Sequence, residues 1–157
     1  MRGHHLVALP VALLVGSAPT PVQAALGDTV ESIELDAARL GQAHRALVAS
    51  ASTSVRTHLI TSSDGSTVKE FVGPDDRVFA VSWNTRFKPR LDTLLGQYAS
   101  TYASAASQAS RSPGIRHSVA FVQGDLVIEA SAHLNAHAGR AYLRSLVPAD
   151  ARVDDIR

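Results

Sequence analysis

Cysteine is absent from the 157-residue sequence. This absence excludes disulfides, iron–sulfur clusters and any lipid attached through cysteine. It also removes the commonest ligand of structural zinc sites. The fold must therefore be stabilised by the packing of apolar side chains, and a chain of this length buries enough surface for that.

A long hydrophobic run is also missing, since a membrane-spanning helix needs about 20 apolar residues. The longest uncharged apolar stretch, residues 6–16, follows Arg2 and precedes small residues at Val22 and Ala24. This order is typical of a secretory signal peptide that is cleaved after Ala24. We expect residues 1–24 to be removed, leaving an exported protein in the periplasm or the extracellular medium, with no membrane span after cleavage.

Charge of one sign is not in excess. Without Arg2, 14 basic residues face 14 acidic ones, and the two signs are interleaved along the chain. Proteins that bind nucleic acid usually gather basic side chains on one face. We therefore expect no nucleic-acid partner.

Catalytic motifs are scarce. His133 and His137 are four residues apart but lack the glutamate of the metalloprotease pattern HExxH. The adjacent carboxylates Asp75 and Asp76 fall in a turn, where aspartate is favoured for its own backbone hydrogen bonds. No GxSxG nucleophile elbow or phosphate-binding glycine loop occurs. The sequence predicts no catalytic, metal-binding or cofactor-binding residue, and no cofactor.

The patterns that are present alternate between helical and strand periodicity. Asp28 and Glu31 resemble a capping box at the start of a helix. Ser63-Asp64-Gly65 and Gln123-Gly124 are hairpin signals. The predicted helices span 28–49 and 89–109, and the predicted strands span 54–61, 67–72, 77–83, 116–122 and 125–132. The segment after residue 132 is short and ambiguous.

These elements predict an α+β fold. An antiparallel sheet, made of a three-strand meander and a C-terminal hairpin, packs on one main helix, and an additional N-terminal helix lies apart from that core. The expected division is a cleavable signal peptide (1–24), an N-terminal helical segment (25–50) and an α+β domain (51–157). Phe79, Val81 and Trp83 alternate along one strand, so we expect all three to face the core.

Four residues are candidate contacts for a partner or ligand: Trp83, Phe87, Arg140 and Tyr142. Trp83 and Phe87 lie near the junction between a strand and the second helix, where packing is favoured over a ligand-stacking pocket. Arg140 and Tyr142 occur together in GRAYL, where an anion or a partner could bind, although a surface salt bridge or a sheet edge is favoured.

Several stretches resemble a known family. They include KEFVGPDDRVFAVSW, LDTLLGQY and the C-terminal block from Gly124 to Arg157, together with AALG and DAARLG near the start. These stretches are similar to the bacterial exported family called domain of unknown function 2844. The resemblance implies an exported bacterial protein and no assigned activity, cofactor or catalytic residue. The sequence NTRFKP after Trp83 departs from the family pattern, which normally has a short glycine–proline turn there.

Two functions follow from these observations. The first is a non-enzymatic exported domain that binds a protein, a peptide or an envelope component, using for example an exposed strand edge. The alternative is a small periplasmic hydrolase whose Ser, His and Asp side chains come from distant positions. A deep pocket with convergent titratable groups would favour the hydrolase, and a shallow surface with a bare strand edge would favour the binding domain.

Overall fold

A computed structural model describes residues 26–40, 43–47, 54–109 and 118–157. The expected signal peptide lies outside these residues. The strands are β1 (Ala43–Leu47), β2 (Arg56–Thr61), β3 (Thr67–Val72), β4 (Val78–Thr85), β5 (Ser118–Gln123), β6 (Leu126–His133) and β7 (Ala136–Leu143). The α-helices are α1 (Ser32–Leu40), α2 (Leu91–Leu95) and α3 (Ala99–Ala109), and short 3-10 turns follow at Gly96–Tyr98, Arg144–Leu146 and Val153–Asp155.

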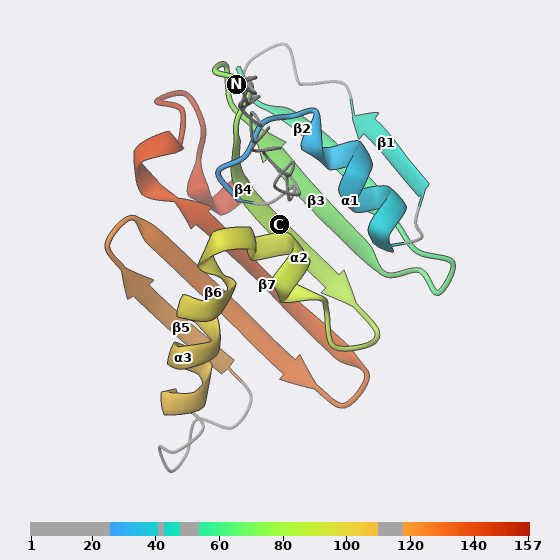
Figure 1. Ribbon diagram of the computed structural model, residues 1–157, viewed down its shortest axis with the longest axis vertical. Helices are drawn as coiled ribbons and strands as arrows, with labels where there is room; N and C mark the ends of the chain where they lie inside the picture. Colours follow the sequence, from blue (N-terminus) through green and yellow to red (C-terminus); the bar gives the residue numbers. More distant parts are fainter. Residues whose placement is uncertain (1–25, 41–42, 48–53, 110–117) are drawn as a thin grey trace, which may run out of the picture.

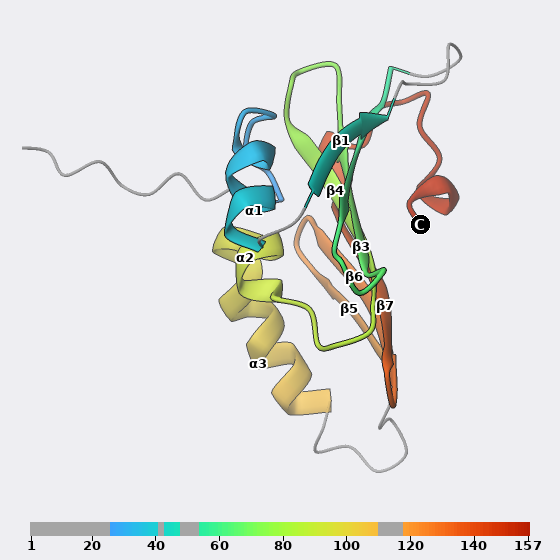
Figure 2. The same ribbon diagram turned by 90° about the vertical axis from the view of Figure 1, so that its right-hand side faces the viewer.

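The strands form one antiparallel sheet in the order β1-β2-β3-β4-β7-β6-β5 (Figure 1). All three α-helices lie on one side of this sheet (Figure 2). The α+β class with an antiparallel sheet is therefore confirmed. We call the side under the helices the helix face and the opposite side the outer face.

Tight turns set the register of the hairpins. The β2–β3 turn contains Gly65 at φ +82°, and the β5–β6 turn contains Gly124 at φ +58°. Glycine adopts these left-handed angles without the steric cost that a Cβ atom brings. The β5–β6 turn pairs Gln123 with Leu126, so its two loop residues are Gly124 and Asp125.

The helix face carries the larger apolar core. Leu94 and Leu95 of α2 pack there with Val81 and Trp83 of β4. Ile33 of α1 is also fully buried in this cluster, because α1 lies over the sheet rather than apart from it. The expectation that the first helix stays outside the core is wrong.

The outer face is covered at one end by residues 147–157, which we call the C-terminal segment (Figure 2). Ile156 of this segment is 2% exposed and packs with Phe71, Phe79 and Ala80. The C-terminal segment therefore closes a second, smaller core on the side of the sheet that faces away from the helices.

Phe79 does not share a face with Val81 and Trp83, contrary to the expectation from alternation. The register shifts between Phe71 and Val72, because Phe71 pairs with Ala80 whereas Val72 pairs with Val78. Phe79 is thus the extra residue of a β-bulge, and a bulge re-aims the side chains on either side of it. Val81 and Trp83 belong to the core of the helix face, and Phe79 belongs to the smaller core.

The secondary-structure predictions need correction in three places. The helix predicted over 28–49 ends at Leu40, and residues 43–47 form β1, which pairs with β2. The ambiguous segment after residue 132 contains β7, which lies between β4 and β6 in the middle of the sheet. The predicted helix 89–109 is divided by a 3-10 turn that begins at Gly96, where φ is +49°.

A contact that depends on the ionisation of Asp150 joins the C-terminal segment to the residues just before β2. The Asp150 carboxylate accepts hydrogen bonds from the Ser54 backbone N–H at 2.7 Å and from the Ser54 hydroxyl at 2.9 Å. These bonds hold the pKa of Asp150 below its ordinary value of 3.8. A carboxyl whose pKa is lower in the folded than in the unfolded state stabilises the fold when it is ionised.

We expect the Asp150 contribution to be complete above pH 3.8 and to be lost as the pH falls through the lowered folded-state pKa. Urea unfolding of the wild type and of Asp150→Asn across the acidic range measures this. The difference in unfolding midpoint should shrink toward zero in acid, because the asparagine amide of the variant does not titrate. A difference that stays constant with pH would contradict the assignment.

Candidate functional site

The outer face carries two rows of side chains that cross five strands, from β3 to β5. The residues of each row lie opposite one another in the strand register. The first row is Lys69, Ser82, Arg140, Glu129 and Ala120, and the second is Thr67, Asn84, Ala138, Ser131 and Ser118. Most of these side chains are short, so the sheet remains uncovered between the C-terminal segment and the β6–β7 turn.

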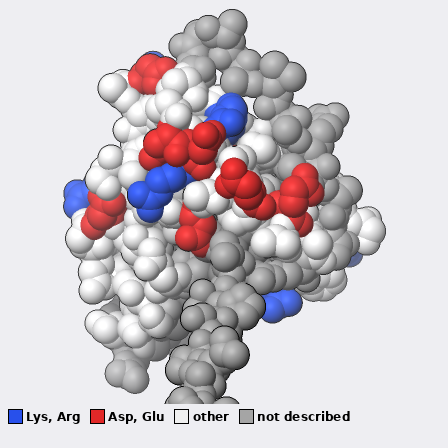
Figure 3. Space-filling view, turned by 45° about the horizontal axis from the view of Figure 1, so that its top comes forward, with Lys and Arg blue, Asp and Glu red and all other residues white. Residues whose placement is uncertain are grey.

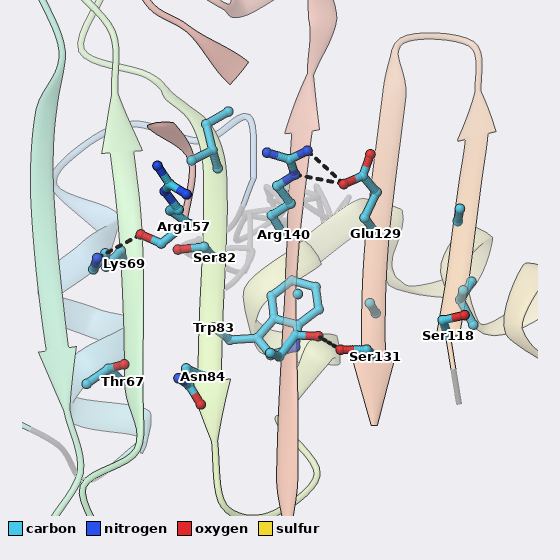
Figure 4. Close-up of a pocket in the computed structure, with 16 residues that line it drawn as sticks. Thr67, Lys69, Ser82, Trp83, Asn84, Ser118, Glu129, Ser131, Arg140 and Arg157 are labelled. Carbon is cyan, nitrogen blue, oxygen red and sulfur yellow. Dashed lines mark hydrogen bonds and ion pairs between the residues drawn. The ribbon is translucent and has the colours of Figure 1, made fainter. Parts of the chain in front are cut away.

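These two rows line a cavity of about 630 Å³, which we call the outer groove (Figure 4). Five strands spaced by about 4.8 Å give the groove a length of about 19 Å, which matches about six residues of an extended chain. Its volume lies in the ordinary range of ligand pockets. Hydroxyl and amide groups of Thr67, Asn84, Ser118 and Ser131 offer both donors and acceptors along its floor.

An ion pair in which two arginine nitrogens share one carboxylate oxygen joins β7 and β6 in the groove (Figure 4). Arg140 contacts one carboxylate oxygen of Glu129 through Nε at 2.9 Å and through Nη2 at 2.8 Å. Its remaining Nη1 donates to the Val153 carbonyl oxygen at 2.7 Å. Arg140 therefore links Glu129 of the groove to the C-terminal segment.

The C-terminal segment borders one side of the groove, in the direction along which the strands run. The Lys69 ammonium group donates to the backbone oxygen of Arg157 at 2.7 Å, and Ile156 and Arg157 both line the groove. Arg157 lies beside Ser82 in Figure 4. The C-terminal segment therefore limits the width of the groove beside Lys69 and Arg140.

In the middle of the groove the floor is formed by β4 and β7 where Trp83 lies opposite Gly139. The residue opposite Trp83 on β7 is Gly139, and its missing side chain gives the indole ring room. A Cβ atom at this position would overlap the indole Cζ2 and would lie 2.6 Å from the Glu129 carbonyl oxygen. Trp83 is 4% exposed, so it supports the floor from the helix face and presents no stacking surface.

The four candidate contact residues do not form one site. Arg140 and Trp83 line the outer groove, whereas Tyr142 is half-buried against the smaller core. Phe87 is 65% exposed and lines a separate cavity of about 220 Å³ near the β2–β3 turn. Lys69, Glu129 and their neighbours were missed, because their convergence requires the β7 strand that the sequence pattern did not reveal.

The smaller cavity has one fixed acidic group. The Asp64 carboxylate accepts hydrogen bonds from the Ser66 backbone N–H at 2.9 Å and from the Ser66 hydroxyl at 3.0 Å. These bonds lower the pKa of Asp64. Their geometry is that of a turn that satisfies its own backbone, so Asp64 has a structural role there.

Dispersed catalytic groups do not converge on the outer groove. Among its lining residues there is no histidine, and its carboxylate, Glu129, is held by Arg140. His58 and Glu70 lie opposite each other on β2 and β3, but Glu70 is fully buried and neither residue lines the groove. Within the described ranges, no group of three or more His, Cys, Asp or Glu side chains could hold a metal ion.

Comparisons with known proteins give one match. Residues 22–156 match the model of the family described as protein of unknown function (DUF2844). No curated protein and no solved structure matches the chain. As for membrane insertion, the helices within the described part of the chain are all too short or too polar to cross a bilayer.

Proposed function

Because the chain belongs to the DUF2844 family, whose members have no assigned function, we propose from the geometry of the outer groove that the protein is an exported, non-enzymatic binding domain. Its ligand is a short extended segment of an envelope protein or peptide, laid across the strands. The single observation that carries this proposal is an open groove of about 630 Å³ that spans five strands over short polar side chains.

The chemistry of the groove supports a peptide ligand. A peptide backbone has alternating N–H and C=O groups that need partners, and Ser, Thr and Asn side chains supply partners of both kinds. The fixed Arg140–Glu129 pair adds one charged group of each sign at the groove wall. Chemical turnover is not favoured, because no histidine lines the groove and its glutamate, Glu129, is held by Arg140.

Blocking the groove tests this function. Ala138 is an exposed residue of the floor, and Ala136 is an exposed alanine of the same strand beside the β6–β7 turn. A photo-crosslinking residue at Ala138 should capture a segment of an exported protein, and the same residue at Leu35 on α1, which is 48% exposed, should not. The captured peptide, once synthesised, should bind Ala138→Arg at least about tenfold more weakly than wild type, a loss of about 1.4 kcal/mol.

Ala136→Arg is the matched control and should bind the synthetic peptide as the wild type does. Equal capture at Ala138 and Leu35, or equal affinities of the two arginine variants, would contradict binding in the groove. Cleavage of the peptide by the purified protein would instead favour the alternative hydrolase.

Export is part of the same proposal. The family match begins at residue 22, after most of the expected signal peptide. Leu26 is 1% exposed and its backbone N–H donates to the Leu94 carbonyl oxygen at 3.2 Å. Cleavage after Ala24 would preserve this contact, whereas cleavage a few residues later would remove a core side chain.

We therefore expect the protein recovered from the periplasm or medium to begin at Ala25. Intact-mass measurement of the recovered protein checks this. A species that retains Met1 and fractionates with the membrane would contradict both the cleavage site and export as a soluble domain.

A further inference from the structure

The sheet ends at β5 in a strand with no charged side chain. Among the described residues, β5 pairs with β6 on one side and with no strand on the other. Its sequence, SVAFVQ, contains no lysine, proline or other residue that usually protects a free edge from pairing. At the opposite edge, β1 has His44 and Arg45 in its sequence.

The helix beside this edge is uncharged as well. α3, with the sequence ASTYASAASQA, lacks Asp, Glu, Lys and Arg, although 18% of the chain is charged. α3 contacts β5, and the region where α3 lies is white in Figure 3, while the charged side chains gather higher on that face. Depletion of charge is the compositional mark of an interface core.

We propose that β5 pairs with β5 of a second copy of this chain, antiparallel about a two-fold axis at Ala120. This inference goes beyond ligand binding in the groove and does not depend on it. Residues 118–122 of one β5 then lie opposite residues 122–118 of the other, and opposed residues face the same side of the sheet, as antiparallel pairing requires. The two sheets then form one continuous sheet, in which neither copy has a free β5 edge.

The side chains of β5 match in this register. On the helix face, Val119 of each copy lies opposite Phe121 of the other, which is a favourable pair of β-branched and aromatic residues. Both side chains are half-buried in the single chain, so their free sides become covered on pairing. On the outer face, Ala120 meets Ala120, and Val122, which is 61% exposed, meets Ser118.

A second copy fits this edge better than an unrelated strand for two reasons. Isologous pairing brings no like charges together, because neither β5 nor α3 has any. It also preserves the outer groove, because Ser118 and Ala120 already line the end of that groove and small side chains at the axis keep its floor level. The grooves of the two copies then run into each other across the axis.

Charge placed at the axis tests the proposal. The processed wild-type protein should sediment as a dimer. Ala120→Lys and Ala120→Glu should each weaken the dimer at least about tenfold, because like charges directly opposite each other destabilise a strand pair. An equimolar mixture of the two variants should restore the dimer. This rescue distinguishes loss of pairing from loss of folding, and the exposed Ala136→Lys should remain dimeric.

Single-cysteine crosslinking gives a second readout, since the chain has no cysteine of its own. Ala120→Cys should oxidise to a covalent dimer, and Ala136→Cys should not. A wild type that is monomeric at all concentrations, a dimer unchanged by both charged variants, or a dimer that Ala120→Cys does not crosslink would overturn the proposal. Failure of these tests would leave peptide binding by the groove unaffected, because Ala138 is measured separately.

Discussion

Phe79→Ala is expected to lower the free energy of unfolding by about 3–5 kcal/mol, the usual cost of removing a buried phenylalanine side chain. Phe79 is 1% exposed and its ring centroid lies 6.3 Å from that of Phe71. Because small domains have a total stability of about 5–15 kcal/mol, this loss is large enough to threaten folding. Denaturant unfolding, followed by circular dichroism, measures it.

The structure also predicts where the damage from Phe79→Ala appears. Phe79 packs with Ile156, so the C-terminal segment should loosen before the helix face does. Hydrogen exchange should rise first at residues 147–157. Phe87→Ala is the matched control, since Phe87 is 65% exposed, and it should cost no more than about 0.5 kcal/mol. Similar losses in the two variants would show that the smaller core contributes little stability.

Gly139→Ala is expected to cost up to about 3 kcal/mol, although alanine is the smallest change available. The new Cβ atom would lie 2.6 Å from the Glu129 carbonyl oxygen and would overlap the Trp83 ring. A side chain can rotate away from such an overlap, but a backbone oxygen in the middle of a sheet moves only if the strand moves. Relief therefore requires β6 and β7 to separate locally.

Trp83 reports this strain directly, because it is the only tryptophan in the sequence. The emission of Gly139→Ala should shift to longer wavelength as the indole ring loses its buried position. The control Ala138→Val changes an exposed neighbour on the same strand, and its stability and emission should match those of the wild type within about 0.5 kcal/mol. An unshifted emission and unchanged stability in Gly139→Ala would mean that the ring is not packed over Gly139.

Local patterns predicted much of the fold because local interactions decide it. Strand β3 coincides with the predicted 67–72, and the predicted helix 89–109 covers α2, the 3-10 turn and α3. The N-terminal helix was predicted too long, because Ala43–Leu47 continues a helix-compatible spacing and also suits a strand. Pairing with β2 decides between the two, and that pairing is not visible in the local pattern.

The candidate site was harder to predict than the fold. The β7 sequence AHAGRAYL is rich in alanine and glycine, which are poor strand formers, so its pattern did not indicate a central strand. Arg140 was selected from the sequence, but its partner Glu129 was not, because the two meet only through the β6–β7 pairing. Phe87 and Tyr142 were selected by residue type, and tertiary packing places them elsewhere.

Composition and short-range order alone specify several properties of this protein. These are the absence of cysteine chemistry, the balanced charge, the strand and helix periodicity and the family resemblance. Which face of the sheet each residue occupies depends instead on the tertiary fold. One extra residue at Phe79 reverses a side-chain alternation, and one strand, β7, brings Lys69, Arg140 and Glu129 onto the same surface. Both effects arise from pairing between strands distant in sequence, where register, rather than residue type, sets the neighbours of each side chain.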